Sequence, residues 1–89
     1  MAEQITLKVA ASSNPPSLGG AIVRNIQEGK EVEVLAVGAG AVNQAVKGIA
    51  IASGYAAPQG IVLSNRVGFV DVDIENEQKT GMKFKIIVE

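Results

Sequence analysis

The chain of 89 residues contains no cysteine and no histidine. Without cysteine, neither a disulfide nor a thiolate metal site can form. Without histidine, the chain lacks the side chain that most often serves as a general base and as a metal ligand. No serine is spaced with a base in a pattern typical of a nucleophile. We therefore expect a protein that is not an enzyme and that holds no cofactor and no metal.

The chain also lacks a strong charge of either sign and a long apolar run. Eight Lys and Arg against nine Asp and Glu give a net charge of −1, so any attraction to nucleic acid must come from a local patch. The start Met1-Ala2-Glu3-Gln4 has no basic and apolar segments of a signal peptide, and glycines interrupt the apolar stretches. We expect one cytoplasmic domain over residues 1–89 with no membrane segment. A domain this small gains from sharing apolar surface with a second copy.

Hydrophobic periodicity predicts the element order β-α-β-α-β-β. Strands are expected at 5–9, 31–37, 61–74 and 82–88, with a bulge or bend at 64–66 and a turn at 75–77. One helix is expected to start beside Pro15-Pro16 and to end at Gly29, and a second to span 41–53. This order predicts a two-layer α/β (α+β) fold, with a four-stranded mixed sheet and both helices on one face.

The second helix carries two stripes of different character. Its predicted core stripe consists of Val42, Ala45, Val46, Ile49 and Ala52. The opposite face combines Asn43, Gln44 and Lys47 with Gly48 and Ile51. Since Ile51 is a large apolar residue on a polar face, we expect Gly48 and Ile51 to contact a second copy of the chain. A lone exposed isoleucine is the alternative, because single apolar side chains are common on surfaces.

Two glycines lie where the second strand gives way to the second helix. A helix N-terminus presents free backbone N–H groups, which favour an anion. The run Gly38-x-Gly40-x-x-Asn43 is not a dinucleotide fingerprint, because Asn43 replaces the third glycine, and Gly-Lys-Ser/Thr of a P-loop never occurs. The glycines therefore indicate either an anion site or merely a tight turn from strand to helix.

The string Gly-Ala-Gly-Ala-Val-Asn-Gln-Ala-Val-Lys at 38–47, with Ile-Ala-Ile-Ala at 49–52, closely resembles the stage V sporulation protein S family. Ser13-Asn14-Pro15 and the closing Ile86-Ile87-Val88-Glu89 extend the resemblance over nearly the whole chain. It implies a small bacterial protein of sporulation and developmental regulation. It also implies a fold like that of Alba, the dimeric archaeal chromatin and RNA-binding protein.

In Alba-like proteins, nucleic acid is held by the loop after the first strand, the start of the second helix and the last hairpin. The resemblance thus implies a nucleic-acid or anion site made by Lys8, Ser12, Ser13, Asn14, Gly40, Asn43, Gln44, Lys47 and Arg66. The chain departs from the sporulation family at Ser12, where a lysine is usual, and at Ser53, where an arginine is usual. Four carboxylates in the hairpin, Asp71, Asp73, Glu75 and Glu77, would repel phosphates. We interpret them as a solvated hairpin edge rather than a metal site.

Two functions follow from these features. The first is a regulatory homodimer that binds DNA or RNA weakly and with strong salt dependence, since it has few cations. The second is a protein-protein interaction or scaffold module with no nucleic-acid binding, which the slightly acidic charge favours.

Overall fold

The computed structural model describes residues 2–89, and its element order is the predicted β-α-β-α-β-β. The elements are β1 (Gln4–Val9), α1 (Pro15–Gln27), β2 (Glu31–Ala36), α2 (Ala39–Ala56), the short 3₁₀ turn η1 (Ala57–Gln59), β3 (Leu63–Ile74) and β4 (Glu77–Val88). The second helix and the last strand are longer than predicted, because Gly54 lies inside α2 and β4 continues to the hairpin turn. No helix of these residues is long and apolar enough to cross a membrane.

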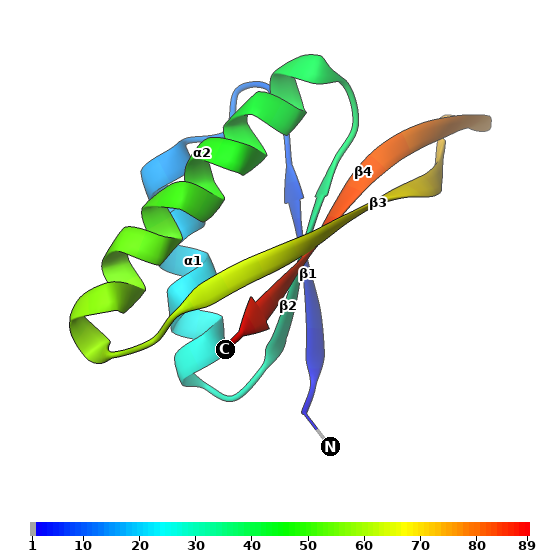
Figure 1. Ribbon diagram of the computed structural model, residues 1–89. Helices are drawn as coiled ribbons and strands as arrows, with labels where there is room; N and C mark the ends of the chain where they lie inside the picture. Colours follow the sequence, from blue (N-terminus) through cyan, green and yellow to red (C-terminus); the bar gives the residue numbers. More distant parts are fainter. Residues whose placement is uncertain (1) are drawn as a thin grey trace.

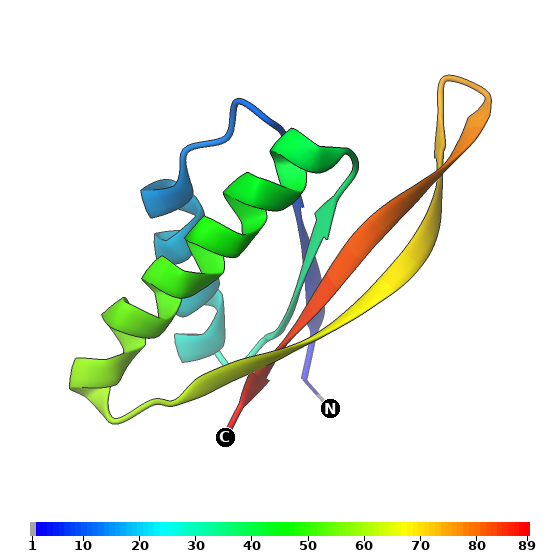
Figure 2. The ribbon, with the colours of Figure 1, turned by 45° about the horizontal axis from the view of Figure 1, so that its top comes forward.

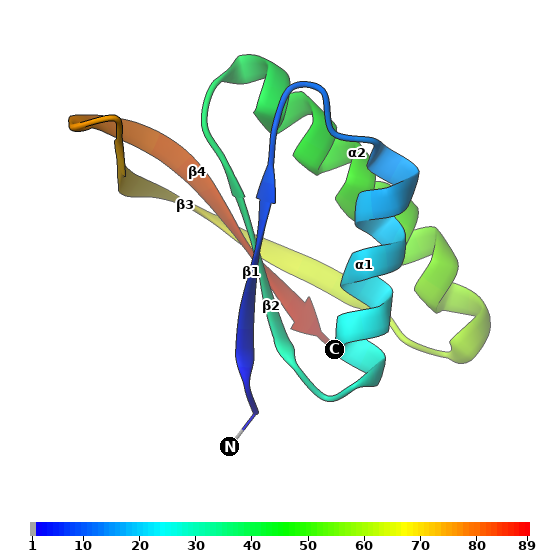
Figure 3. The ribbon, with the colours of Figure 1, turned by 180° about the vertical axis from the view of Figure 1, so that it is seen from behind.

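The four strands form one mixed sheet in the order β1-β2-β4-β3. β1 pairs with β2 in parallel, whereas β4 runs antiparallel to both β2 and β3. Both helices lie on one side of this sheet (Figure 1), and the view from behind shows the same arrangement (Figure 3). The predicted fold class is therefore confirmed, and one face of the sheet is left without a covering layer.

The core lies between the helices and the covered face of the sheet. Alternation along the strands sends Val9, Val34 and Phe84 toward the helices, and Val34 is fully buried. Ile22 of α1 meets them and is also fully buried. By the transfer scale, each such side chain contributes about 1.5–3 kcal/mol of stability when it is fully removed from water.

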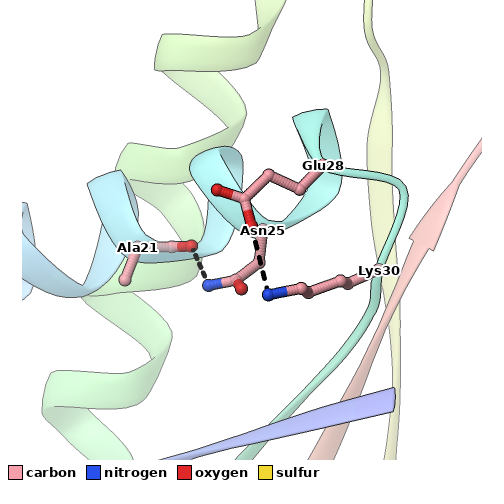
Figure 4. A network of polar contacts seen from close by, with 4 residues as sticks. All are labelled: Ala21, Asn25, Glu28 and Lys30. Carbon is pink, nitrogen blue, oxygen red and sulfur yellow. Dashed lines mark hydrogen bonds and ion pairs between the residues drawn. The ribbon is translucent and has the colours of Figure 1, made fainter. Parts of the chain in front are cut away.

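α1 begins and ends as the sequence predicts. The side chain of Asn14 accepts a hydrogen bond from the backbone N–H of Ser17 at 2.9 Å, and Pro15 is the first helical residue. Gly29 follows the helix with a φ of 79°, in the left-handed region that favours glycine. Near this end, buried Asn25 donates its amide to the carbonyl of Ala21 at 2.8 Å (Figure 4). An ion pair between Lys30 and Glu28, 3.1 Å long, borders this end (Figure 4).

The two helices approach closely at Gly48, and this contact corrects the predicted second-copy interface. A Cβ built on Gly48 would lie 2.7 Å from Cγ and 3.0 Å from Cβ of Leu18. A Cβ built on Gly19 would likewise lie 2.8 Å from Cγ2 of Ile51. The face with Gly48 and Ile51, predicted to contact another copy, is therefore occupied by α1 of the same chain.

The predicted core stripe of α2 is wrong at one position. Val46 is 51% exposed, and the buried positions are instead Ala41, Ala45, Gly48, Ile49, Ala52 and Ala56. The buried stripe is rotated toward the smallest residues, because α2 has to pack against both the sheet and α1. The rotation turns Val46 away from the core.

The last two strands form a long hairpin that is closed by a two-residue turn. The hairpin does not contain the predicted bulge. Every residue from Leu63 to Ile74 has its own partner on β4, so no extra residue interrupts the ladder. Glu75 and Asn76 form the turn with φ values of 51° and 64°, which suit the type I′ geometry of two-residue hairpins. The predicted turn is thus confirmed at these two residues. The tip projects away from the helices (Figure 2).

Replacing Gly48 by alanine is expected to destabilise the fold by about 1–3 kcal/mol, because Leu18 would have to move as a whole. The matched control is Gly54→Ala in the same helix, where an added Cβ meets no atom within 4 Å. That control is expected to stabilise the fold by up to about 1 kcal/mol through helix propensity. Urea unfolding of both variants measures the difference. Equal effects of the two substitutions would contradict the described helix contact.

Candidate nucleic-acid interface

The loop between β1 and α1 is held in shape by its own polar groups. The Ser13 hydroxyl accepts a hydrogen bond from the backbone N–H of Ala10 at 2.8 Å, and the Ser13 N–H donates to the Ala10 carbonyl at 3.0 Å. Asn14 is engaged as the cap of α1. Two of the predicted ligands, Ser13 and Asn14, therefore fix the backbone of the loop, while Ser12 is exposed.

The start of α2 lies directly beside this loop. The side-chain amide of Gln44 donates to the carbonyl of Ser13 at 2.8 Å. Gly40 allows close approach here, since a Cβ at Gly40 would lie 2.9 Å from that of Ala11. The structure thus brings together the predicted residues of the loop and of α2. It also gives Gln44 a bracing role within the chain.

The exposed groups on this part of the molecule come from the first three turns of α2. Gly38 precedes the helix with a φ of 93° and has no side chain to cap the first backbone N–H groups. The first turn holds no acidic residue, and Asn43 and Lys47 are both exposed one turn apart. Lys47 is the ninth residue of α2 and lies about 12 Å along the axis from Ala39, so its ammonium extends the positive region of the helix start along the helix. We call this group, Ser12, Asn43, Lys47 and the N-terminus of α2, the loop-helix end.

Arg66 does not join the loop-helix end, and Lys8 meets the predicted loop residues only where it lines a hollow with Ser13 and Asn14. The side chain of Lys8 alternates with those of Leu7 and Val9, which face the helices, so Lys8 lies on the uncovered face of the sheet. Arg66 lies on the same uncovered face, because it pairs with Lys85, which in turn pairs with Glu33 of β2. The structure therefore divides the predicted site between an end of the molecule and the far face of the sheet.

Of the last hairpin, expected as a contact region from Arg66 to Lys83, only Arg66 is among the predicted ligands, and Lys83 and Lys85 are not. Both alternate with the apolar residues Met82, Phe84 and Ile86 of β4, and this period of two was the signal that places them on the uncovered face. Across the strands, Lys85 lies directly beside Arg66. Lys83 lies in the same cross-strand row as Lys8, with Leu35 between them.

The carboxylates of the hairpin are separated by the same alternation. Asp71 and Asp73 pair with Thr80 and Gln78, and the Thr80 hydroxyl donates to Asp71 at 3.5 Å. Their side chains share a face of the hairpin, as expected, and this is the face opposite to that of Arg66. The predicted repulsion of phosphates by these two carboxylates is therefore directed away from Arg66.

Residues 2–89 thus form a small two-layer α+β fold with exposed polar groups near the N-terminus of α2. The family model for Stage V sporulation protein S matches residues 5–89, essentially the whole chain. The chain belongs to this sporulation-related family.

Replacing Gln44 by alanine is expected to free the loop from α2, because the hydrogen bond to the Ser13 carbonyl is lost. The cost is about 1 kcal/mol of stability. Amide hydrogen exchange is expected to rise at residues 10–14 and to stay unchanged at the distant end of α1. Asn43→Ala, an exposed neighbour, is the control and is expected to leave both quantities unchanged. Unaltered exchange in the Gln44 variant would contradict the bracing role.

Proposed function

We propose that this protein is a non-enzymatic regulator that binds nucleic acid as a homodimer in sporulation or developmental regulation. The observation that supports this most is the loop-helix end, where an uncapped helix N-terminus is followed along the same helix by exposed Asn43 and Lys47, with no carboxylate in the first turn. Backbone N–H groups and a lysine are the donors that proteins use on phosphates.

The binding would be weak and dominated by the phosphate backbone. Lys47 is the cation of the loop-helix end, and Ser12 adds a hydroxyl rather than a charge. Because each phosphate contact releases a counterion, affinity would fall as the salt concentration rises. Two copies in one assembly would double the contacts and so raise the affinity through effective concentration.

The surface for a second copy would be the apolar region between α2 and β3. Val46, Val67 and Phe69 are 51%, 50% and 79% exposed on the helix side of the sheet. Between α2 and β3 lies a hollow of about 320 Å³ lined by Val46, Ile49, Ala50, Ser53, Asn65, Val67 and Phe84. This hollow has no charged lining residue, so an identical apolar surface is a fitting occupant. This region replaces the face of Gly48 and Ile51 as the proposed dimer contact.

Reversing the charge of Lys47 tests the nucleic-acid proposal. In a gel-shift titration at low salt, Lys47→Glu is expected to weaken binding of a DNA or RNA oligonucleotide roughly tenfold, about 1.4 kcal/mol. Lys30→Glu changes the net charge equally at the opposite end of α1 and is expected to bind like the parent. The proposal fails if the parent binds no oligonucleotide at low salt, or if both variants lose affinity equally.

Replacing Phe69 by lysine tests the dimer. The substitution is expected to give a monomer in sedimentation velocity without loss of stability, since the side chain is 79% exposed. Val62→Lys, at a side chain that is 63% exposed outside the apolar region of Val46, Val67 and Phe69, is the control and should leave the dimer intact. A parent that sediments as a monomer would contradict the dimer. The alternative, a scaffold module, would then gain support if bound protein partners survive nuclease treatment.

A further inference from the structure

The uncovered face of the sheet carries most of the cations of a chain that is slightly acidic overall. Five of its eight lysines and arginines lie on this face by strand alternation: Lys8, Arg66, Lys79, Lys83 and Lys85. The helices lie on the other side of the sheet (Figures 1 and 3). Although the net charge is −1, most of the positive charge therefore lies on the uncovered side of the sheet.

Four of these cations occupy two neighbouring rows across the strands. One row runs Thr6, Glu33, Lys85, Arg66, and the next runs Lys8, Leu35, Lys83, Gly68. We call them the cationic rows. Lys85 and Arg66 stand directly opposite each other, and like charges in that position destabilise a sheet. An anion bound between them would relieve this repulsion.

Charges within the protein compensate the rows only in part. Glu33 is their one carboxylate, against four cations, which leaves a net charge of +3. Its Oε2 accepts a hydrogen bond from the amide of Gln4 at 3.2 Å. Among residues 2–89 none of the four cations lies within an ion pair. Glu31 lies on the same face, at the start of β2 and beside Gln4 rather than beside Arg66.

The hairpin carboxylates do not cancel this charge. By strand alternation Asp71 and Asp73 belong to the opposite face, and Glu75 lies in the turn. Asp73 borders a hollow that Lys8 and Leu35 also line, so it offsets part of the charge at Lys8 and none at Arg66. Glu77 shares the face of the rows but stands at the tip of the hairpin, with Lys79 between it and Lys83. The cationic rows thus form a local positive surface in the middle of the sheet.

We infer that the cationic rows bind the phosphate backbone of a nucleic acid, as a second contact surface besides the loop-helix end. This inference rests on the proposed nucleic-acid function. Lys8 begins the surface two residues before the loop, and Arg66 ends it at the far edge strand. In the second row Gly68 adds no side chain, and Leu35 adds an apolar one between Lys8 and Lys83.

The mode of binding follows from what this face holds. The three aromatic residues of the chain, Tyr55, Phe69 and Phe84, all belong to the helix side. Bases therefore find no aromatic ring on which to stack beside the rows, and stacking is the usual source of base contacts on an open sheet. The rows bind phosphates without preference for sequence.

The decisive measurement is the salt dependence of affinity for a single-stranded 20-nucleotide oligonucleotide. The double variant Lys83→Gln/Lys85→Gln is expected to lower the slope of log K against log salt by about 1.4, at about 0.7 for each lost phosphate contact. The control Arg24→Gln removes a charge from the last turn of α1, away from the rows, and is expected to keep the parent slope. A double variant that keeps the parent slope, as this control does, would overturn the inference.

An amide NMR titration of the parent with the same oligonucleotide separates the two surfaces. Shifts at Arg66, Lys83 and Lys85 support the cationic rows, whether or not the loop-helix end responds. Shifts confined to residues 38–47 overturn this inference and leave the proposed function standing. Shifts confined to the rows overturn the proposed site at the loop-helix end, and the absence of any shift overturns both.

The same titration with poly-L-glutamate distinguishes nucleic acid from an acidic protein. The rows are expected to respond to the oligonucleotide and to respond less to the peptide at equal charge concentration. A response to poly-L-glutamate without a response to the oligonucleotide would overturn the assignment to nucleic acid.

Discussion

The contact of Leu18 with Gly48 determines how the helical layer is built. With no side chain at Gly48, α2 lies close to α1, and the buried alanines of α2 rest on the sheet. The same contact fixes the rotation of α2 about its axis. Because of that rotation, Gln44 reaches the loop carbonyl of Ser13 while Val46 turns toward solvent. Both the loop-helix end and the proposed dimer surface depend on this one approach of two helices.

Strand alternation is the second constraint, and it organises the charge. A sheet covered on one side requires apolar side chains at every second position, so polar residues collect on the other side. In β4 this rule places Lys83 and Lys85 on the uncovered face beside Arg66 of β3. In the hairpin beyond the helices the pattern reverses, because Asp71 and Asp73 alternate to the helix side and Val72 between them to the uncovered side. The distribution of charge over the two faces thus depends on the fold and cannot be deduced from the net charge.

The sequence predicted the elements well because their signals are local. Asn14 and Pro15 mark the start of α1, and Glu75-Asn76 marks the hairpin turn. The errors concern tertiary choices. Hydropathy predicted Val46 in the core, but this side chain is exposed. The helix packs against α1 at Gly48 instead, a residue that hydropathy ranks low, because any side chain there would clash with Leu18. The polar stretch at 64–66 suggested a bulge, but an edge strand bears polar side chains without losing its register. The candidate site was predicted in its loop and helix parts and missed in Lys83 and Lys85, whose proximity to Arg66 depends on strand order.

The residues of the predicted site lie in two separate places, and this changes which of them we expect to act together. Lys8 and Arg66, expected to act with Lys47, lie on the opposite side of the sheet, where they have Lys83 and Lys85 as neighbours. A phosphate backbone held at the loop-helix end would have to pass around the end of β1 to reach them. Lys8 lies at that passage, two residues before the loop begins. In a slightly acidic protein, this placement allows a few cations to act together along one path, because local spacing rather than net charge determines the field that a phosphate meets.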